Sequence, residues 1–273
     1  MAIVTISRQM GTGAYAMAKE LSKKLKYTLI DGPKIAELAK SYGLAEDILE
    51  RVDEKPPAYI TAEDRLQAAN LSTMELILLD AARKGNVVMY GRGAQYLLEG
   101  MTNVLRVRII APFEERVENL AEREWIDPDL ARDLIRRSDH QRGGFTHFYF
   151  DRDWQSPFEY DLVFNTSRLS KSAIVEAIVA AAKDPKLKEG EADLTSHLDD
   201  LILRKRVEVA LLKSGKIGSL HFKIECMDGA ISLTGHVHND EEREEAVRIA
   251  EKVKGVKQVD DDLQVMNYQH HLE

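Results

Sequence analysis

A glycine-bearing turn near the start of the chain is the segment best suited to chemistry. Residues 3–6 are apolar, residues 7–13 read Ser-Arg-Gln-Met-Gly-Thr-Gly, and a helical pattern runs from Thr12 to Leu25. A strand, a glycine turn and a helix form the frame of a loop that binds phosphate through backbone N–H groups. The same pattern also occurs in tight strand-to-helix connections that bind nothing, so both interpretations stay open.

The loop lacks two side chains of the phosphate-binding motif G-x-x-x-x-G-K-[ST]. In that motif a lysine reaches the β and γ phosphates, and a serine or threonine hydroxyl binds Mg²⁺. With Gly13 set on the last glycine, Arg8 stands at the first glycine position. Ala14 then takes the lysine position and Tyr15 the hydroxyl position. We expect Arg8 to replace part of the missing charge, whereas Tyr15 offers no small hydroxyl for Mg²⁺.

Strand patterns alternate with helical patterns through the first two thirds of the chain. Apolar runs typical of buried strands occur at 3–6, 27–30, 86–90, 104–110 and 161–164. Helical patterns cover 12–25, 62–84, 112–124, 128–138 and 170–183. This alternation predicts an α/β fold of three layers, in which helices cover both faces of a parallel sheet.

Ligand-binding loops of such a sheet lie at the carboxyl ends of its strands. Four segments are expected to meet there: residues 7–13, Asp31, residues 91–93 and the segment after Pro112. Gly91-Arg92-Gly93 is consistent with a binding loop and equally with a turn whose glycines adopt positive φ.

A charged stretch divides the chain. Residues 184–191 contain Pro, Gly and several charges without apolar periodicity, which is typical of a linker. Beyond it, helical patterns occupy 198–212 and 240–253, and alternating strand patterns occupy 220–226, 230–235 and 258–265. This order predicts a small α+β domain with αββαβ topology.

Composition limits the classes of partner. The 273 residues carry a formal charge of −8, which argues against a nucleic-acid-binding surface. The single cysteine, Cys226, has no internal disulfide partner, and neither a leader nor a long apolar span begins the chain. We therefore expect a cytoplasmic protein with no nucleic-acid partner and no stable membrane attachment. These patterns do not predict an oligomeric state.

No metal site is predicted from the sequence. His236 and His238 share one face of a predicted strand, but no third ligand is near them. Residues 260–262 are three aspartates that suit a cation and equally a charged strand edge that resists pairing.

Several short segments, by their order and spacing, resemble the cytidylate-kinase-like family, a branch of the nucleoside monophosphate kinases with a P-loop fold. They are residues 6–13, 27–31, 91–93, 111–117, 139–142 and 161–170. Residues 196–267 resemble a BON domain through residues 228–237 and 255–259. The predicted boundaries are 1–183 for a kinase-like domain with a helical lid, 184–195 for a linker, 196–267 for a BON-like domain and 268–273 for a tail.

The resemblance implies phosphorylation of a pyrimidine nucleoside monophosphate by ATP and Mg²⁺ beneath the lid. The implied ATP-binding residues are Ser7, Arg8, Gly11, Thr12, Gly13, Ala14 and Tyr15. The implied acceptor-binding residues are Asp31, Gly91, Arg92 and Gly93. The implied catalytic residues are Arg142, Asp139, Arg136 and Arg92. Gly93 stands where cytidylate kinases carry an acidic residue, which weakens the argument for cytosine recognition.

Two functions stay open at this point. One is an active kinase, favoured by Asp139, Arg142 and Arg92. The other is a nucleotide-binding regulatory module with little turnover, favoured by Ala14 and Tyr15. The regulatory module would signal through the BON-like domain to a protein or small-ligand partner.

Structural interpretations stand beside these functional ones. The lid arginines also suit a solvated helix face with ion pairs, formed by Arg136, Arg137 and Arg142 with Glu122, Asp129 and Asp133. The aromatic residues after the lid suit core packing first and base stacking second; they are Phe145, Phe148, Tyr149, Phe150 and Trp154.

Overall fold

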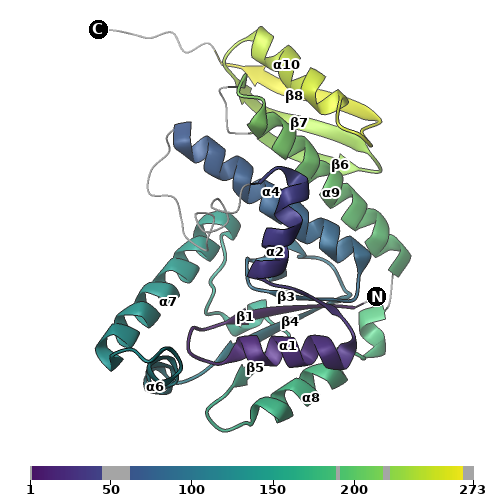
Figure 1. The fold of residues 1–273 in the computed structure, drawn as a ribbon. Helices are drawn as coiled ribbons and strands as arrows, with labels where there is room; N and C mark the ends of the chain where they lie inside the picture. The colour runs from purple at the N-terminus through teal and green to yellow at the C-terminus, as the bar shows by residue number, and fades with distance from the viewer. Residues whose placement is uncertain (1, 45–61, 189–190, 218–221, 267–273) are drawn as a thin grey trace. The chain divides into compact units, whose positions relative to one another are not determined.

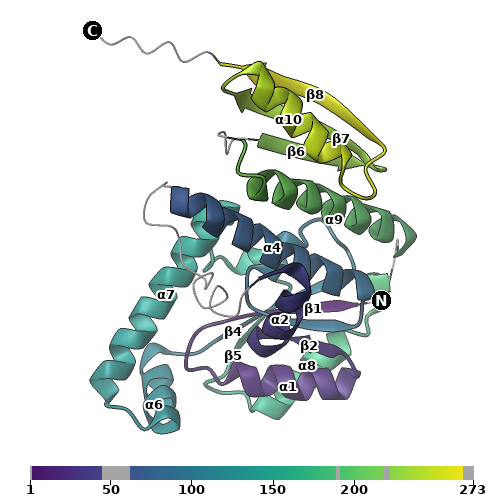
Figure 2. The same ribbon diagram turned by 45° about the horizontal axis from the view of Figure 1, so that its top comes forward.

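The computed structural model describes residues 2–44, 62–188, 191–217 and 222–266. The chain forms two compact units, one of Met1–Pro57 with Lys84–Glu191 and one of Ala58–Arg83 with Ala192–Glu273. Each unit contains its own β-sheet (Figures 1 and 2).

The first unit is built on a parallel sheet of five strands. They are β1 (Ile3–Arg8), β2 (Thr28–Ile30), β3 (Val87–Tyr90), β4 (Val104–Ile110) and β5 (Leu162–Asn165). Their order is β2-β3-β1-β4-β5, and every neighbouring pair is parallel. The predicted α/β fold with a parallel sheet is therefore confirmed, and the carboxyl ends of all five strands share one edge.

Helices α1 (Ala14–Leu25) and α8 (Lys171–Ala181) pack together on one face of this sheet (Figure 1). Alternate apolar residues of β1 and β4 form a common core with them; those on the two strands are Val4, Ile6, Leu105, Val107 and Ile109. The other helices of the unit are α2 (Gly32–Ala39), α5 (Ala94–Leu97), α6 (Phe113–Glu124) and α7 (Pro128–Phe150). Three 3₁₀ helices lie at η1 (Lys40–Tyr42), η2 (Pro157–Glu159) and η3 (Pro185–Lys188).

Helix α7 is longer than its sequence pattern predicts. The periodicity indicates an end at Ser138, but the helix continues to Phe150 through Gly143 and Gly144. Each glycine costs about 1 kcal/mol of helix propensity relative to alanine. Phe145 is 3% exposed and its ring centroid lies 5.0 Å from that of Tyr149. Burial of one large apolar side chain contributes about 2–3 kcal/mol, which offsets the glycines.

The second unit combines one helix from the middle of the chain with the C-terminal residues. Its elements are α4 (Ala62–Lys84), α9 (Glu191–Lys213), β6 (Phe222–Met227), β7 (Ala230–Val237), α10 (Asp240–Glu251) and β8 (Gln258–Val265). β6 and β7 are antiparallel, and β7 and β8 are parallel. The predicted αββαβ order is confirmed from α9 to β8, although α9 begins at Glu191 rather than Leu198. The predicted domain boundaries stay predictions.

A buried charged cluster joins α4 to α9. Lys205 Nζ lies 2.7 Å from Glu75 Oε2 and 2.7 Å from Glu208 Oε2. The side chains of Lys205 and Glu75 are each 10% exposed. Ser72 Oγ donates a hydrogen bond to Glu208 Oε1 at 2.7 Å. Burial lowers the pKa of Lys205, but the attraction of the two carboxylates outweighs it and the pKa is raised.

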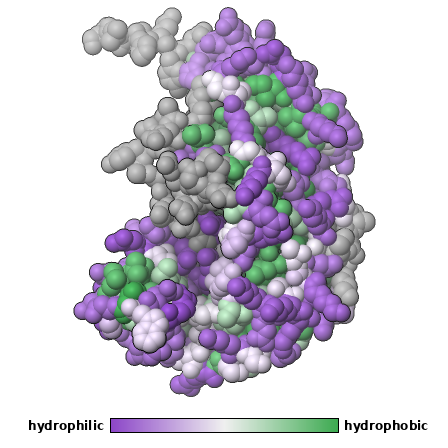
Figure 3. Space-filling view, viewed as in Figure 1, coloured by the Kyte–Doolittle hydropathy of each residue, from purple (hydrophilic) through white to green (hydrophobic). Residues whose placement is uncertain are grey.

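Charged and polar side chains cover most of the face shown in Figure 3. Apolar side chains gather in smaller areas between them. The large apolar side chains that are most exposed are Trp125, at 94%, and Phe158, at 96%. Within the described residues, no helix has the length and apolar character needed to cross a membrane.

We predict that Lys205→Ala lowers the free energy of unfolding by about 3 kcal/mol, because it leaves Glu75 buried without its cation. Arg83→Ala is the matched control. It breaks the pair with Asp199, whose two side chains are 41% and 52% exposed, and we expect a loss of about 0.5 kcal/mol. Urea unfolding at pH 7 measures both, since a raised lysine pKa makes this contribution fully present below about pH 10. Equal losses in the two variants would contradict the prediction.

A second prediction concerns the thiol of Cys226. Burial and a hydrogen bond from Sγ to Asp200 Oδ1, at 3.2 Å, raise its pKa to about 11. Alkylation requires the thiolate. The rate of reaction with iodoacetamide should therefore be low at pH 8 and rise between pH 9 and 11, and an inflection near pH 8.5 would refute this.

Candidate functional site

The carboxyl edge of the sheet brings the predicted segments together. β1 leads into the loop 9–13, β3 into Gly91, and β2 into Asp31. Gly91 N donates to the Ile6 carbonyl at 3.0 Å, which fixes the turn after β3 against β1. Gln9 N donates to the Ile109 carbonyl at 3.0 Å, which fixes the loop against β4. The loop, Asp31 and Gly91 therefore follow strands that end at one edge of the sheet.

The loop adopts a conformation that only glycine accommodates at one position. Gly11 has φ of +87°, and a Cβ atom there would lie 2.4 Å from the carbonyl oxygen of Arg116. Gly13 has φ of +74° and caps α1. Thr12 Oγ1 donates to the Gln9 carbonyl at 2.8 Å. The N–H groups at the start of α1 lie at its positive dipole end, so the backbone fits a phosphate, although Ala16 N already donates to the Gly13 carbonyl at 3.2 Å.

The two positions that depart from the motif are both engaged within the protein. Ala14 is 2% exposed and belongs to the core between α1 and the sheet. The Tyr15 hydroxyl donates to Asp31 Oδ2 at 2.8 Å, and this bond raises the pKa of Tyr15. Asp31 Oδ1 accepts from Lys34 N at 3.0 Å and caps α2. Tyr15 thus ties α1 to α2, and its hydroxyl does not fit the role of the Mg²⁺ ligand.

Two cations lie beside the loop. The guanidinium of Arg8 stacks on the ring of Tyr90, 4.4 Å from its centroid. Lys171, the first residue of α8, is exposed, and its Nζ lies 3.0 Å from where a Cβ of Gly13 would stand. Sequence reasoning missed Lys171, although its place just after β5 puts it at the same edge of the sheet.

The turn after β3 is strained at its centre. Gly91, Arg92 and Gly93 have φ of +76°, +64° and +69°. Arginine in this left-handed region costs about 1–2 kcal/mol, so neighbouring structure must impose it. A Cβ on Gly93 would lie 2.7 Å from the Phe150 ring, which leaves no space for a side chain. Strain of this kind often occurs at functional sites.

The residues assigned to a lid from the sequence lie on α7. Asp139 Oδ2 lies 2.9 Å from Arg116 Nη1, and Arg116 is 4% exposed. Arg142 Nη1 donates to Ser138 Oγ at 2.6 Å. Arg136 Nη1 lies 4.0 Å from Asp133, and the Arg136 side chain is 66% exposed. Asp139 therefore links α7 to α6. Arg136 forms an exposed ion pair with Asp133, as expected for a solvated helix face.

Two of the five aromatic residues that follow the predicted lid belong to the core. Phe145 and Trp154 are 3% and 4% exposed, whereas Phe148 is 55% exposed. The ring centroids of Tyr96 and Phe150 are 5.2 Å apart. Core packing thus explains the buried members of the group.

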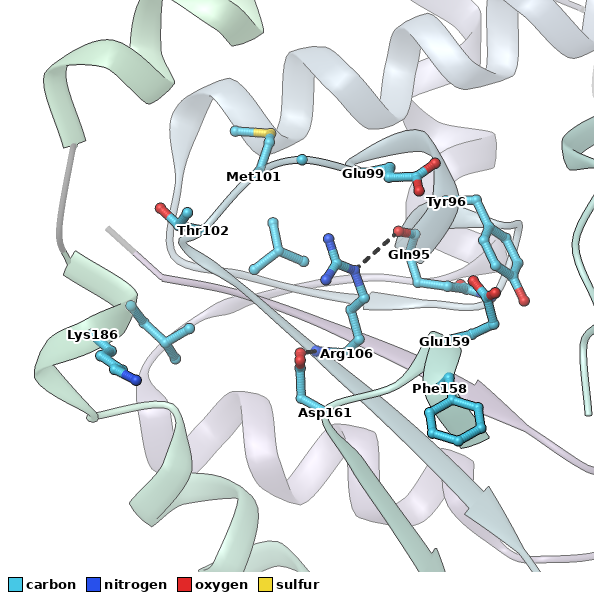
Figure 4. A pocket seen from close by; sticks show the side chains of 13 residues that line it. Gln95, Tyr96, Glu99, Met101, Thr102, Arg106, Phe158, Glu159, Asp161 and Lys186 are labelled. Atoms are coloured by element: carbon cyan, nitrogen blue, oxygen red, sulfur yellow. Dashed lines mark hydrogen bonds between the residues drawn. The ribbon is translucent and has the colours of Figure 1, made fainter. Parts of the chain in front are cut away.

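A separate pocket of about 930 Å³ opens beside β4 (Figure 4). Arg106 projects into it and donates to the Gln95 carbonyl at 3.3 Å. Asp161, Glu159 and Lys186 also line it, so its charges are mixed. It contains none of the predicted site residues, and the chemistry-bearing side chains lie at the carboxyl edge instead.

Comparisons with known proteins show which families the chain resembles. The sequence profile of the cytidylate kinase-like family matches residues 3–168, and that of the BON domain matches residues 199–267. The cytidylate kinase of Methanocaldococcus jannaschii is 28% identical over 183 residues, which cover 66% of this chain and 96% of that protein. The cytidylate kinase of Pyrococcus horikoshii is 28% identical over 185 residues, which cover 67% of this chain and 88% of that protein.

One solved structure supports the fold of the first unit. An uncharacterized protein from Eubacterium ventriosum has a TM-score of 0.54 and 24% sequence identity. The match covers 66% of this chain and 97% of that one. At this identity the likeness shows a shared fold and carries no statement about activity.

We predict that Arg92→Gly is more stable than Arg92→Ala by about 1 kcal/mol, because glycine adopts positive φ without strain. The same pair of changes at Arg123, in helix α6, should show the opposite order, with glycine about 1 kcal/mol less stable. Thermal unfolding of the four variants measures both differences. The same sign at both positions would show that Arg92 is not strained.

Proposed function

This chain belongs to the cytidylate kinase-like family, and we propose that its first unit transfers a phosphoryl group from ATP to a nucleoside monophosphate. The observation that supports the proposal most is the convergence of the loop 7–13, Asp31 and residues 91–93 at one sheet edge. In-line transfer requires two nucleotides bound close together, and the hydrogen bond from Tyr15 at the start of α1 to Asp31 keeps the proposed donor and acceptor regions close.

The donor is assigned to the loop 7–13. ATP supplies the phosphoryl group, and the N–H groups at the start of α1 hold its phosphates. Ser7, Gly11, Thr12, Gly13, Ala14 and Tyr15 contribute mainly backbone and shape. The transferred group carries charge on three oxygens, so cations must surround it. Arg8 and Lys171 lie beside this loop, and we assign to them part of the role of the lysine missing at Ala14. No Mg²⁺ ligand is assigned, since the Tyr15 hydroxyl is directed to Asp31.

The acceptor is assigned to Asp31 and to residues 91–93. Arg92 is held in a strained conformation at the centre of this turn, which suits a side chain positioned for a phosphate. Phe150 leaves no space for an acidic side chain at Gly93, so base selection by residue 93 is absent. We therefore propose CMP and UMP as acceptors without strong preference between them.

The lid function is assigned to α7. Arg142 and Arg136 supply cations from this helix when it approaches the bound phosphates. Asp139 acts through Arg116, whose Nη1 also donates to the Met10 carbonyl at 3.4 Å. Asp139 is thus a positioning residue that keeps α7 in register with the loop.

A second candidate function is a nucleotide-binding regulator with little turnover. The hydrogen bond from Tyr15 to Asp31 favours it, because this bond occupies a carboxylate that the proposed acceptor site would use. In this case the BON domain, residues 199–267, would pass the nucleotide signal to a protein or small-ligand partner.

We further propose a cytoplasmic protein that binds neither nucleic acid nor a membrane stably. The formal charge of −8 argues against nucleic-acid binding. Strong retention of the protein on sedimenting liposomes would overturn the proposal that it does not bind a membrane stably.

The proposal predicts that ATP and Mg²⁺ convert CMP or UMP to the diphosphate, as measured by chromatography against AMP and GMP. Lys171→Ala and Arg142→Ala should each lower kcat by about 10²-fold, the usual loss for one electrostatic donor. Lys183→Ala, which removes an exposed lysine beyond the end of α8, is the matched control and should leave kcat unchanged.

The outcomes separate the two candidate functions. Product that disappears in Arg142→Ala, purified in the same way, identifies the activity as that of this chain and not of a contaminant. Absence of product with saturable ATP binding supports the regulator, and absence of binding refutes both.

A further inference from the structure

Strand β4 carries a buried arginine that pairs with no carboxylate in the part of the chain that the structure describes. Arg108 is 3% exposed and pairs with Ser7 in the register of β4 with β1. Its guanidinium lies 4.3 Å from the centroid of the Trp154 ring and 5.2 Å from that of Tyr160. Among the residues that the structure describes, no aspartate or glutamate lies within ion-pair distance of it.

The hydrogen bonds of Arg108 go to neutral hydroxyl groups. Nη1 donates to the Tyr160 hydroxyl at 3.0 Å and, more weakly, to Ser7 Oγ at 3.5 Å. Ser7 Oγ also accepts from Trp154 Nε1 at 3.1 Å. The network gives the guanidinium two acceptors and two aromatic faces, but it does not neutralise the charge.

Such a charge is strongly unfavourable in the free protein. Removal of a cation from water is compensated only by a well-placed anion, and stacking on aromatic rings recovers part of the loss. A methionine or phenylalanine of similar volume would fill this position without that cost. The arginine is therefore better explained by a bound anion than by packing.

The position of Arg108 points to the loop 7–13. Ser7 begins that loop, and Arg108 reaches it from the neighbouring strand. The motif lysine is missing at Ala14, so the loop lacks the charge that usually faces phosphate. A buried cation attracts an anion more strongly than an exposed one, because the surrounding dielectric is low.

We propose that Arg108 supplies a buried positive charge for the phosphate of a ligand at this loop and so compensates for the absent lysine. The proposal rests on the phosphate-binding function proposed above. Arg108 acts through its field and through Ser7, so it is a positioning residue. The recognised chemistry is a phosphate group, carried either by the donor triphosphate or by the acceptor monophosphate.

The test is isothermal titration calorimetry of the full chain with ATP, CMP and pyrophosphate, together with the thermal midpoint of the free protein. For Arg108→Met we expect a dissociation constant raised on the order of tenfold or more and a midpoint that is unchanged or higher. The matched control is Arg106→Met, two residues earlier on the same face of β4. Arg106 donates to the Gln95 and Leu98 carbonyls at 3.3 and 3.4 Å, so its variant should lose stability and keep its affinity.

The outcomes distinguish this proposal from the function on which it rests. Weaker binding of ATP but not CMP by Arg108→Met assigns the charge to the triphosphate, and the reverse assigns it to the acceptor. Unchanged affinity of Arg108→Met for all three ligands overturns the proposal for Arg108 and leaves the proposed function in place. A lower thermal midpoint with unchanged affinity also overturns it, because Arg108 would then only stabilise the fold. No binding by the wild-type chain overturns both.

A second pair of variants, one that keeps the positive charge and one that removes it, keeps the test valid if Arg108→Met does not fold. Arg108→Lys should bind within a few-fold of wild type, and Arg108→Gln about tenfold more weakly. Equal affinities in these two variants would refute the proposal.

Discussion

The close contact between the loop and helix α6 is the constraint on which the site depends. The backbone of Gly11 lies against the backbone of Arg116 with no space for a side chain. The Arg116 side chain then extends to Asp139 on α7. The close backbone contact links the loop to α6, and the partly buried ion pair links α6 to α7, so the three segments are held in one geometry. Any movement of α7 toward a ligand must therefore preserve or break the bond at Asp139.

Charge is distributed around this loop in an unusual way. The motif places one lysine within the loop itself, whereas here the cations come from β1, β4 and α8, as Arg8, Arg108 and Lys171. Arg8 lies within the loop at the end of β1, whereas Arg108 and Lys171 approach it from β4 and α8. Arg108 is buried and Lys171 is exposed. Electrostatic stabilisation depends on the summed field at the phosphate, so several distributed charges can do the work of one contact. A loop without its lysine is therefore not by itself evidence of lost function.

Much of the fold follows from the sequence pattern, because apolar periodicity determines which faces are buried. The five strands and the helix 62–84 were predictable for that reason. The end of α7 was not, since the burial of Phe145 depends on distant residues that local periodicity does not contain. The site was predictable only as a set of loops at one sheet edge. Arg108 was hidden within an apolar strand, and only three-dimensional contacts show that its neighbours are hydroxyls and rings. A charged residue at alternate positions of a buried strand is the signal that could have found it.

Helix α4 has a consequence for how the chain folds during its synthesis. It lies within the segment matched by the kinase-like family, yet it clusters with residues near the C-terminus. The ribosome releases Glu75 long before Lys205, so the carboxylate stays hydrated until the distant lysine emerges. Such non-local pairing raises contact order and delays completion of the fold. The charged cluster between α4 and α9 therefore forms only after residues that follow the kinase-like segment have been made.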